Sequence, residues 1–177
     1  GAATAQDHTG NGGEFIWMDF SIPDEGVALT TLEIDVTPLT VPNLEFYFYT
    51  NNTSDNSIND LIVEAWDGSA WTTIDSIHQN LGGWTKFSYV LSTYTYGTNL
   101  VKIQFRAEDG GGTQFYQDFL LDDISVIEAP TCPGTANGVL SNITTTSVDF
   151  AWTEQGSATQ WEVEYGTAGF VLGTGTS

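Results

Sequence analysis

Two adjacent carboxylates, Asp122 and Asp123, lie inside the apolar segment FLLDDISVI. Successive side chains of a β-strand point to opposite faces, so one of the two is expected to face inward unless a bulge intervenes. A buried carboxylate is stabilised by an arginine, by backbone donors or by a cation. The sequence therefore leaves two interpretations open: a structural role, as an ion pair with Arg106 or a turn cap, and a site for a hard cation.

The cation interpretation needs further oxygen ligands, which Asp7, Asp118 and the backbone carbonyls of residues 8–10 could supply. A cluster of loop and strand oxygens suits the flexible coordination of calcium better than the strict octahedron of magnesium. The spacing does not follow an EF-hand loop. We predict a Ca2+ site formed by Asp7, Asp118, Asp122 and Asp123.

Aromatic side chains are the second group that could bind a ligand, since the chain contains 6 Trp, 7 Tyr and 10 Phe. Exposed rings stack on sugars and anchor protein interfaces, although most rings of a small β domain belong to its core or to cross-strand pairs. The rings in excess of a small core include Trp66, Trp71, Tyr89 and Tyr116. We predict that Trp84, in NLGGWTKF, forms a solvent-facing platform with Tyr94 and Tyr96, in STYTYGT.

The sequence offers little support for catalysis. His8, His78 and Cys132 do not supply the three or four converging ligands that a zinc site requires, and His8 is expected to be a satisfied loop or core residue. The chain has no G-x-S-x-G segment and suggests no thiol–imidazole pair. None of its 23 acidic residues stands out as half of a glycosidase acid–base couple. We therefore do not expect an enzyme.

The charge balance is strongly acidic, with 23 acidic residues against 3 basic ones and a net charge of -20. Nucleic-acid binding rests on clustered lysine and arginine, so this balance argues against it and, on the same ground, against anionic membranes. No apolar run approaches the length of about 20 residues that spans a bilayer, so direct membrane insertion is not expected. The surplus acid fits solubility, or a salty or calcium-rich medium.

The elements that position these residues are expected to be β-strands, because no window shows a helical period and short apolar runs alternate with polar turn residues. Eight strands are predicted, at residues 14–20, 30–37, 43–50, 60–66, 71–77, 85–91, 99–107 and 117–127. The link Asp67-Gly68-Ser69-Ala70 joins two of them as a hairpin. This pattern predicts an all-β fold, an antiparallel jelly-roll β-sandwich rather than a parallel sheet with helices.

The composition changes at EAPTCPGTANG, where two prolines interrupt regular strand pairing. We therefore divide the chain into a first domain at 1–128, a linker at 129–137 and a second β domain at 138–177. The second domain is shorter than an immunoglobulin-like sandwich of about 100 residues, so it is expected to be partial.

The segments DHTGNGGEFIWMDFS, WDGSAWTTI, VKIQFRAEDGGG and FLLDDISV make residues 1–129 resemble a MAM domain, an extracellular jelly-roll module. DHT near the start and LDDI near the end are the most specific marks of this resemblance. It implies a cation near the last strand, and a first strand upstream of DHT that would be missing here, leaving an exposed edge or a gap in the core. Animal MAM domains carry disulfide cysteines, whereas residues 1–131 contain none.

The second domain, with TCPG, SVDFAWTE and QWEVEYG, resembles the first strands of a fibronectin type III domain, an immunoglobulin-like β-sandwich. The resemblance implies that Trp152 is the core tryptophan of strand B and that Tyr165 closes strand C. A MAM domain followed by a fibronectin type III domain is similar to large secreted or surface proteins of Bacteroidetes, which implies type IX secretion. In that context Asp75-Ser76-Ile77 resembles a short O-glycosylation motif with Ser76 as the acceptor.

The function expected from these observations is a non-catalytic adhesion or recognition module of a larger secreted or cell-surface protein, stabilised by a cation. Its partners would be a protein or a glycan at the cell surface, and the other domains of the same polypeptide. The alternative is a carbohydrate-binding module, or an accessory domain, of a secreted polysaccharide-degrading enzyme or peptidase.

Overall fold

The computed structural model describes residues 6–10, 12–20, 26–52, 58–108, 117–130, 136–154, 158–167, 170–171 and 174–176. The chain divides into two compact units, Gly1–Ala129 and Pro130–Ser177. All regular secondary structure in the described ranges is β-strand, so the prediction of an all-β fold is confirmed. These ranges contain no helix with the length and apolar character needed to span a bilayer.

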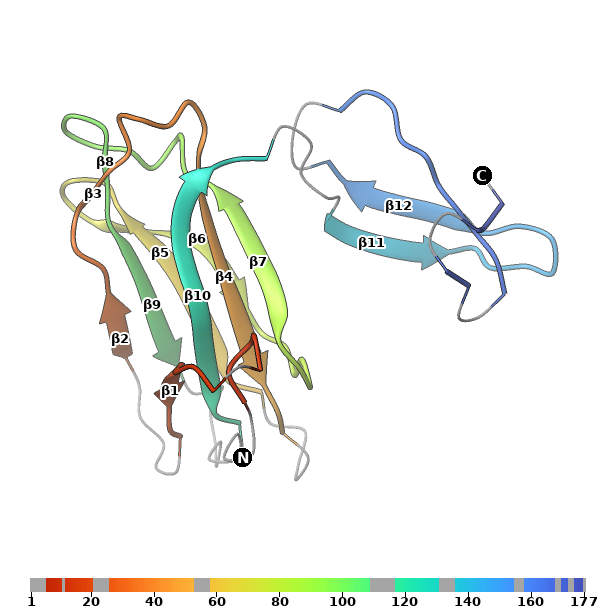
Figure 1. Ribbon diagram of the computed structural model, residues 1–177, viewed down its shortest axis with the longest axis horizontal. Helices are drawn as coiled ribbons and strands as arrows, with labels where there is room; N and C mark the ends of the chain where they lie inside the picture. The colour runs from red at the N-terminus through yellow and green to blue at the C-terminus, as the bar shows by residue number, and fades with distance from the viewer. Residues whose placement is uncertain are drawn as a thin grey trace. The chain divides into compact units, whose positions relative to one another are not determined.

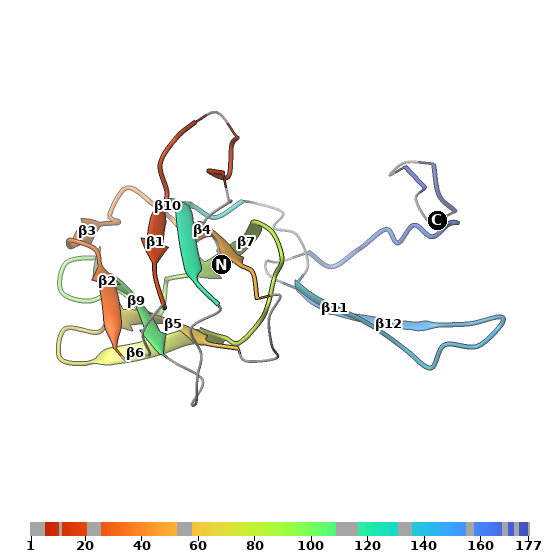
Figure 2. The same cartoon turned by 90° about the horizontal axis from the view of Figure 1, so that it is seen from below.

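The first unit is a sandwich of two four-stranded antiparallel sheets, which face each other as two layers (Figures 1 and 2). Sheet A has the order β1 (Ile16–Met18), β10 (Phe119–Glu128), β4 (Pro42–Thr50) and β7 (Thr85–Val90). Sheet B has the order β2 (Val27–Thr30), β9 (Ile103–Glu108), β5 (Asp60–Trp66) and β6 (Trp71–Ile77). A further short pair joins β3 (Ile34–Asp35) to β8 (Leu100–Val101).

The pairing of the strands confirms the predicted jelly roll. The first strand pairs with the last, β1 with β10, and the second strand pairs with the one before the last, β2 with β9. This inward-winding order is the arrangement of a jelly roll.

Two segments that were predicted as single strands are each divided into two strands. The segment 30–37 divides between β2 and β3, and the segment 99–107 divides between β8 and β9. The Thr31 hydroxyl accepts a hydrogen bond from the Ile103 backbone N–H at 3.0 Å, and the Thr31 N–H donates to the Ile103 carbonyl at 2.9 Å. The Thr31 hydroxyl therefore takes the place of a backbone acceptor, so the pairing of β2 with β9 ends at Thr31 and the chain leaves sheet B. Local alternation does not reveal such a break, because both halves keep the strand pattern.

The hydrophobic core fills the space between the two sheets. Its fully buried side chains alternate along the central strands, and they include Leu44, Phe46 and Phe48 of β4, Leu61 and Val63 of β5, Ile103 and Phe105 of β9, and Phe119 and Leu121 of β10. The rings of Phe46 and Phe105 meet edge to face across the sandwich at 4.9 Å. Because strand side chains alternate, the residues between these core positions lie on the two outer faces, where a ligand could bind.

The second unit contains the hairpin of β11 (Ala136–Ser141) and β12 (Asp149–Thr153). Trp152 lies on β12 but is only half-buried, and the predicted strand ending at Tyr165 does not form. Tyr165 makes only an isolated bridge to Thr176 and is 66% exposed. A strand needs a neighbour for its backbone hydrogen bonds, and the described part of this unit offers that segment little pairing beyond the bridge. The resemblance to fibronectin type III remains a prediction.

Candidate functional site

The DHT segment lies against the outer face of sheet A. Figure 1 shows the red N-terminal trace passing in front of β10 and β4. The His8 ring stacks on Tyr47 of β4 with the ring centroids 3.3 Å apart. The His8 backbone N–H donates to Asp122 Oδ2 at 2.9 Å, and His8 Nδ1 lies 2.8 Å from Asp123 Oδ2. We call these contacts the His8 clamp.

A bulge explains why both aspartates are available to the clamp. The pairing of β10 with β4 shifts register between Asp122 and Ser125, and Asp123 has a φ of 50°. Neither carboxylate therefore faces the core, because the bulge that the sequence expectation named as its exception is present here. The alternative of an ion pair with Arg106 is wrong, because Arg106 pairs with Glu64 on sheet B. Local sequence does not show a bulge, which arises from the register of two distant strands.

The other two predicted calcium ligands have separate hydrogen-bonding roles. Asp7 is buried and accepts hydrogen bonds from the Thr9 hydroxyl and from the Gly12 N–H at 3.2 Å. Asp118 accepts the Phe20 N–H at 3.2 Å. Across the described ranges, no three His, Cys, Asp or Glu side chains come together as a metal site. The four aspartates do not fit a shared Ca2+ site in this arrangement, and calcium binding remains a prediction.

Thermal unfolding distinguishes the clamp from a cation site. The clamp is solvent-accessible, so Asp123→Ala is expected to lower the melting temperature by about 2 °C, equally in calcium and in chelator. Wild-type curves that superimpose in the two conditions would support the clamp alone. A calcium-dependent rise of the wild-type Tm that Asp123→Ala abolishes would instead support the cation site.

The three residues of the predicted aromatic platform are not brought together. Trp84 precedes β7, whereas Tyr94 and Tyr96 follow it, so the six residues of that strand, about 20 Å, separate them. Trp84 Nε1 donates to the Gln6 carbonyl at 2.8 Å, on the sheet A side. Tyr94 packs against the core. The single platform is wrong, because the chain positions that flank a strand lie at opposite ends of the sheet.

Three further residues were singled out in the sequence. Tyr89 donates its hydroxyl to Asp75 at 2.6 Å, and burial together with Asp75 raises the pKa of Tyr89. Ser76 is exposed on β6, where its glycosylation remains a prediction. Tyr116 lies outside the described residues.

The outer face of sheet B brings two tryptophans together at the β5–β6 hairpin. Trp66 and Trp71 are paired across the hairpin, with ring centroids 5.4 Å apart and an interplanar angle of 63°. Asp67 closes the turn by accepting the backbone N–H groups of Ala70 and Ser69, both at 2.8 Å. These donors lower the pKa of Asp67. The turn therefore holds both rings in a defined position.

Tyr96 lies beside the hairpin turn that joins the two tryptophans. A Cβ placed on Gly68 would be 3.5 Å from Tyr96 Cδ2, so the tyrosine ring covers the hairpin turn. Its hydroxyl donates to Glu33 at 2.8 Å, and desolvation together with Glu33 raises the pKa of Tyr96. One residue of the predicted platform thus packs against the turn that joins Trp66 to Trp71.

A hydrogen-bonded polar row continues from the tryptophans along sheet B. Glu64 is 6% exposed, and Arg106 Nε and Nη2 donate to its two carboxylate oxygens at 3.0 and 3.1 Å. Gln104 Nε2 donates to Glu64 Oε2 at 3.0 Å. Arg106 Nη1 also contacts Glu108, and the bond to Glu64 raises the pKa of Arg106. We call Glu64, Trp66, Trp71, Gln104 and Arg106 the sheet-B site.

The sequence contains part of the signal for this site. In NLVKIQFRA, the polar residues Lys102, Gln104 and Arg106 alternate with buried apolar ones, which places them on one face. The two tryptophans of WDGSAW flank the predicted hairpin, so their pairing follows from the turn. The approach of Glu64 to Arg106 depends on the pairing of β5 with β9, which sequence reasoning did not supply.

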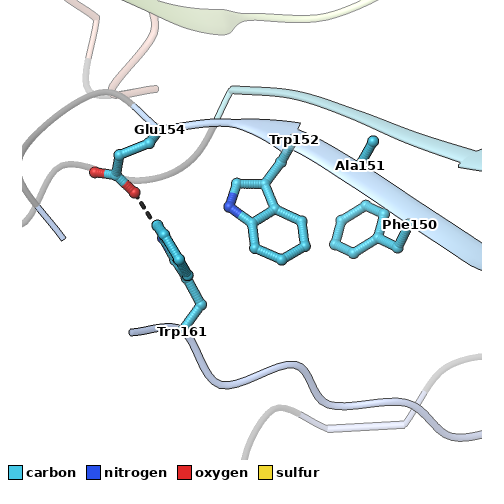
Figure 3. A pocket seen from close by; sticks show the side chains of 5 residues that line it. All are labelled: Phe150, Ala151, Trp152, Glu154 and Trp161. Atoms are coloured by element: carbon cyan, nitrogen blue, oxygen red, sulfur yellow. Dashed lines mark hydrogen bonds between the residues drawn. The ribbon is translucent and has the colours of Figure 1, made fainter. Parts of the chain in front are cut away.

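The second unit contains an aromatic cleft of about 320 Å³, lined by Phe150, Ala151, Trp152, Glu154 and Trp161 (Figure 3). Trp161 Nε1 donates to Glu154 Oε2 at 2.6 Å, and the Trp152 and Trp161 rings lie 5.6 Å apart. Phe150 and Trp161 remain 42% and 46% exposed. An isolated hairpin buries little apolar surface, so this cleft is the uncovered face of a small sheet.

Comparisons with known proteins do not identify a family. No family model matches the chain. No curated protein matches it either. The fold therefore defines this protein only as an all-β jelly-roll sandwich, with the sheet-B site as a candidate functional surface.

Solved structures similar to this chain include carbohydrate-binding modules. TmCBM61 in complex with β-1,4-galactotriose has a TM-score of 0.43 and 14% identity, over 65% of this chain and 69% of that one. A family 16 carbohydrate-binding module has a TM-score of 0.41 and 16% identity, over 64% and 76%. The CBM22-1–GH10 modules of Clostridium thermocellum xylanase 10B, complexed with xylohexaose, have a TM-score of 0.41 and 16% identity, over 76% of this chain and 25% of that one. Likenesses this distant do not identify a ligand.

Proposed function

We propose that this protein is a non-catalytic glycan-recognition module and that the glycan binds at the sheet-B site. The observation that carries the proposal is the adjacency of the Trp66–Trp71 pair to the hydrogen-bonded row of Glu64, Gln104 and Arg106. Because its ligand would be a polysaccharide outside the cell, the module would belong to a secreted or cell-surface protein.

Sugar recognition requires the two kinds of surface that meet at this site. A pyranose ring presents C–H groups on its faces and hydroxyl groups at its edge. Indole rings provide an apolar surface for the first, and fixed planar polar side chains provide directional hydrogen bonds for the second. The closed turn at Asp67 and the bidentate pair of Arg106 with Glu64 hold these groups in place before binding, which reduces the entropy lost on binding.

Protein adhesion is the second candidate function, and it is favoured by a different surface. The edge strand β1 exposes Ile16 and Trp17, which are 39% and 51% exposed. Exposed apolar side chains on an edge strand are typical of sites to which another chain adds a strand. This surface lies on sheet A and does not include the sheet-B site, so the two candidates can be separated by mutation.

The test is binding to a panel of plant and bacterial polysaccharides, screened by affinity electrophoresis. For each polysaccharide that binds, the affinity for oligosaccharides derived from it is then measured by calorimetry. Trp71→Ala is expected to weaken binding by about tenfold or more, since a central aromatic anchor is removed. Trp17→Ala is the matched control and is expected to bind as the wild type does. Unchanged binding by Trp71→Ala, or no binding to any member of the panel, would contradict the proposal.

A further inference from the structure

Lys102 lies at the aromatic end of the sheet-B site. Val101 and Ile103 on either side of it are fully buried, so the lysine points to the outer face, as Gln104 does. Its ammonium group lies 5.8 Å from the centroid of the Trp71 ring. A cation over an indole ring is attracted to the face of that ring. Lys102 is therefore held next to the surface on which a sugar would stack.

Lys102 differs from the two other basic residues of the chain in its partners. Lys86 contacts Glu45 at 2.8 Å, and Arg106 contacts Glu64 and Glu108. In the parts of the chain that the structure describes, no carboxylate lies within ion-pairing distance of Lys102. With 23 acidic residues in the chain, a lysine could readily be paired. Three ammonium N–H donors thus remain for an acceptor that the described chain does not supply.

We propose that Lys102 binds the carboxylate of an acidic sugar, so that the glycan carries a uronic acid next to the residue that stacks on Trp71. This inference rests on the proposed function and specifies its ligand class. The carboxylate would accept a charge-assisted hydrogen bond from the Lys102 ammonium group. Such a bond is stronger than a hydrogen bond to a neutral hydroxyl. The indole lies on one side of the ammonium group, so the carboxylate would bind from the sides that the ring leaves open.

The surrounding charge limits how many acidic sugars the ligand can carry. Arg106 is already neutralised by Glu64 and Glu108, and Glu33 lies near the hairpin through its bond to Tyr96. The net charge of -20 repels a polyanion as a whole. The ligand is therefore a mostly neutral chain with occasional uronic acid residues, and a glycan with a carboxylate on every residue is expected to bind more weakly.

Carboxyl reduction provides matched ligands, because it converts each uronate carboxylate into a CH2OH group and leaves the backbone of the glycan unchanged. The probes are glucuronoxylan and the uronate-bearing glycans of the panel, each before and after reduction, with polygalacturonate as the fully acidic glycan. The proteins are the wild type, Lys102→Met, and Lys86→Met as the matched control, because Lys86 lies on β7 of sheet A. Binding is measured by calorimetry at an ionic strength of about 0.15 M, which keeps screening constant.

We expect the wild type and Lys86→Met to bind the native glycan about five- to tenfold more tightly than its reduced form. Lys102→Met is expected to bind both forms equally and as the wild type binds the reduced form. Equal wild-type affinity for the two forms would overturn the inference, as would an unchanged preference in Lys102→Met or tighter binding of polygalacturonate. In those cases a loss of binding in Trp71→Ala would leave the proposed function standing. No binding to any probe would overturn both.

Discussion

Phe46→Ala is expected to lower the free energy of unfolding of the first unit by about 4 kcal/mol. Phe46 is fully buried and meets Phe105 edge to face across the sandwich, with Phe87 stacked at 5.5 Å on the same sheet. Removing the ring leaves a cavity between β4 and β9, and strands on both sides limit how far the cavity can collapse. The outer faces of both sheets depend on this contact, so glycan binding should also decline as the unit opens.

Hydrogen exchange read by mass spectrometry measures this effect in the full chain, because peptides from β4 and β9 report the first unit separately from the second. The control is Phe15→Ala. The Phe15 ring is half-buried, and its centroid lies 6.1 Å from that of the Trp84 ring. It is expected to cost about 1 kcal/mol or less, since the surface site leaves no enclosed cavity. Equal losses of protection in the two variants would show that the sandwich is not held by the Phe46–Phe105 contact.

The sequence was sufficient for the fold because each central strand of the sandwich has one buried face. In residues 43–50 and 60–66 the apolar pattern and the turn between β5 and β6 fix the strand positions, and strands form there within one residue of the prediction. The break at Thr31 was missed for a physical reason. It depends on a side-chain hydrogen bond to Ile103, which is far away in the chain.

The candidate site was less predictable because it depends on register. Asp122 and Asp123 were predicted as Ca2+ ligands, but a bulge turns both outward to His8. Trp84 and Tyr96 were grouped by composition, although β7 lies between them. A ligand surface on a sheet is built from residues of neighbouring strands, so it can be read from sequence only after the strand pairing is known.

Arg106→Met is expected to destabilise the first unit by about 3 kcal/mol and to abolish measurable glycan binding. The substitution leaves the buried Glu64 carboxylate with only Gln104 as a described side-chain donor. A buried charge that loses its partner is costly, whereas replacing both partners by uncharged groups is often close to neutral. We therefore expect Glu64→Gln in the Arg106→Met background to restore most of the lost stability.

The double-mutant cycle separates the stability of this pair from its part in recognition. The coupling energy between Arg106 and Glu64, measured by urea unfolding, should exceed about 1.5 kcal/mol. The control Lys86→Met should lower the free energy of unfolding by about 1 kcal/mol or less, because Lys86 and Glu45 form a more exposed pair. The double variant should be folded and still bind glycan poorly, since the planar groups of Glu64 and Arg106 are altered. If it binds as the wild type does, the pair serves the fold alone, and recognition at sheet B rests on Trp66, Trp71 and Gln104.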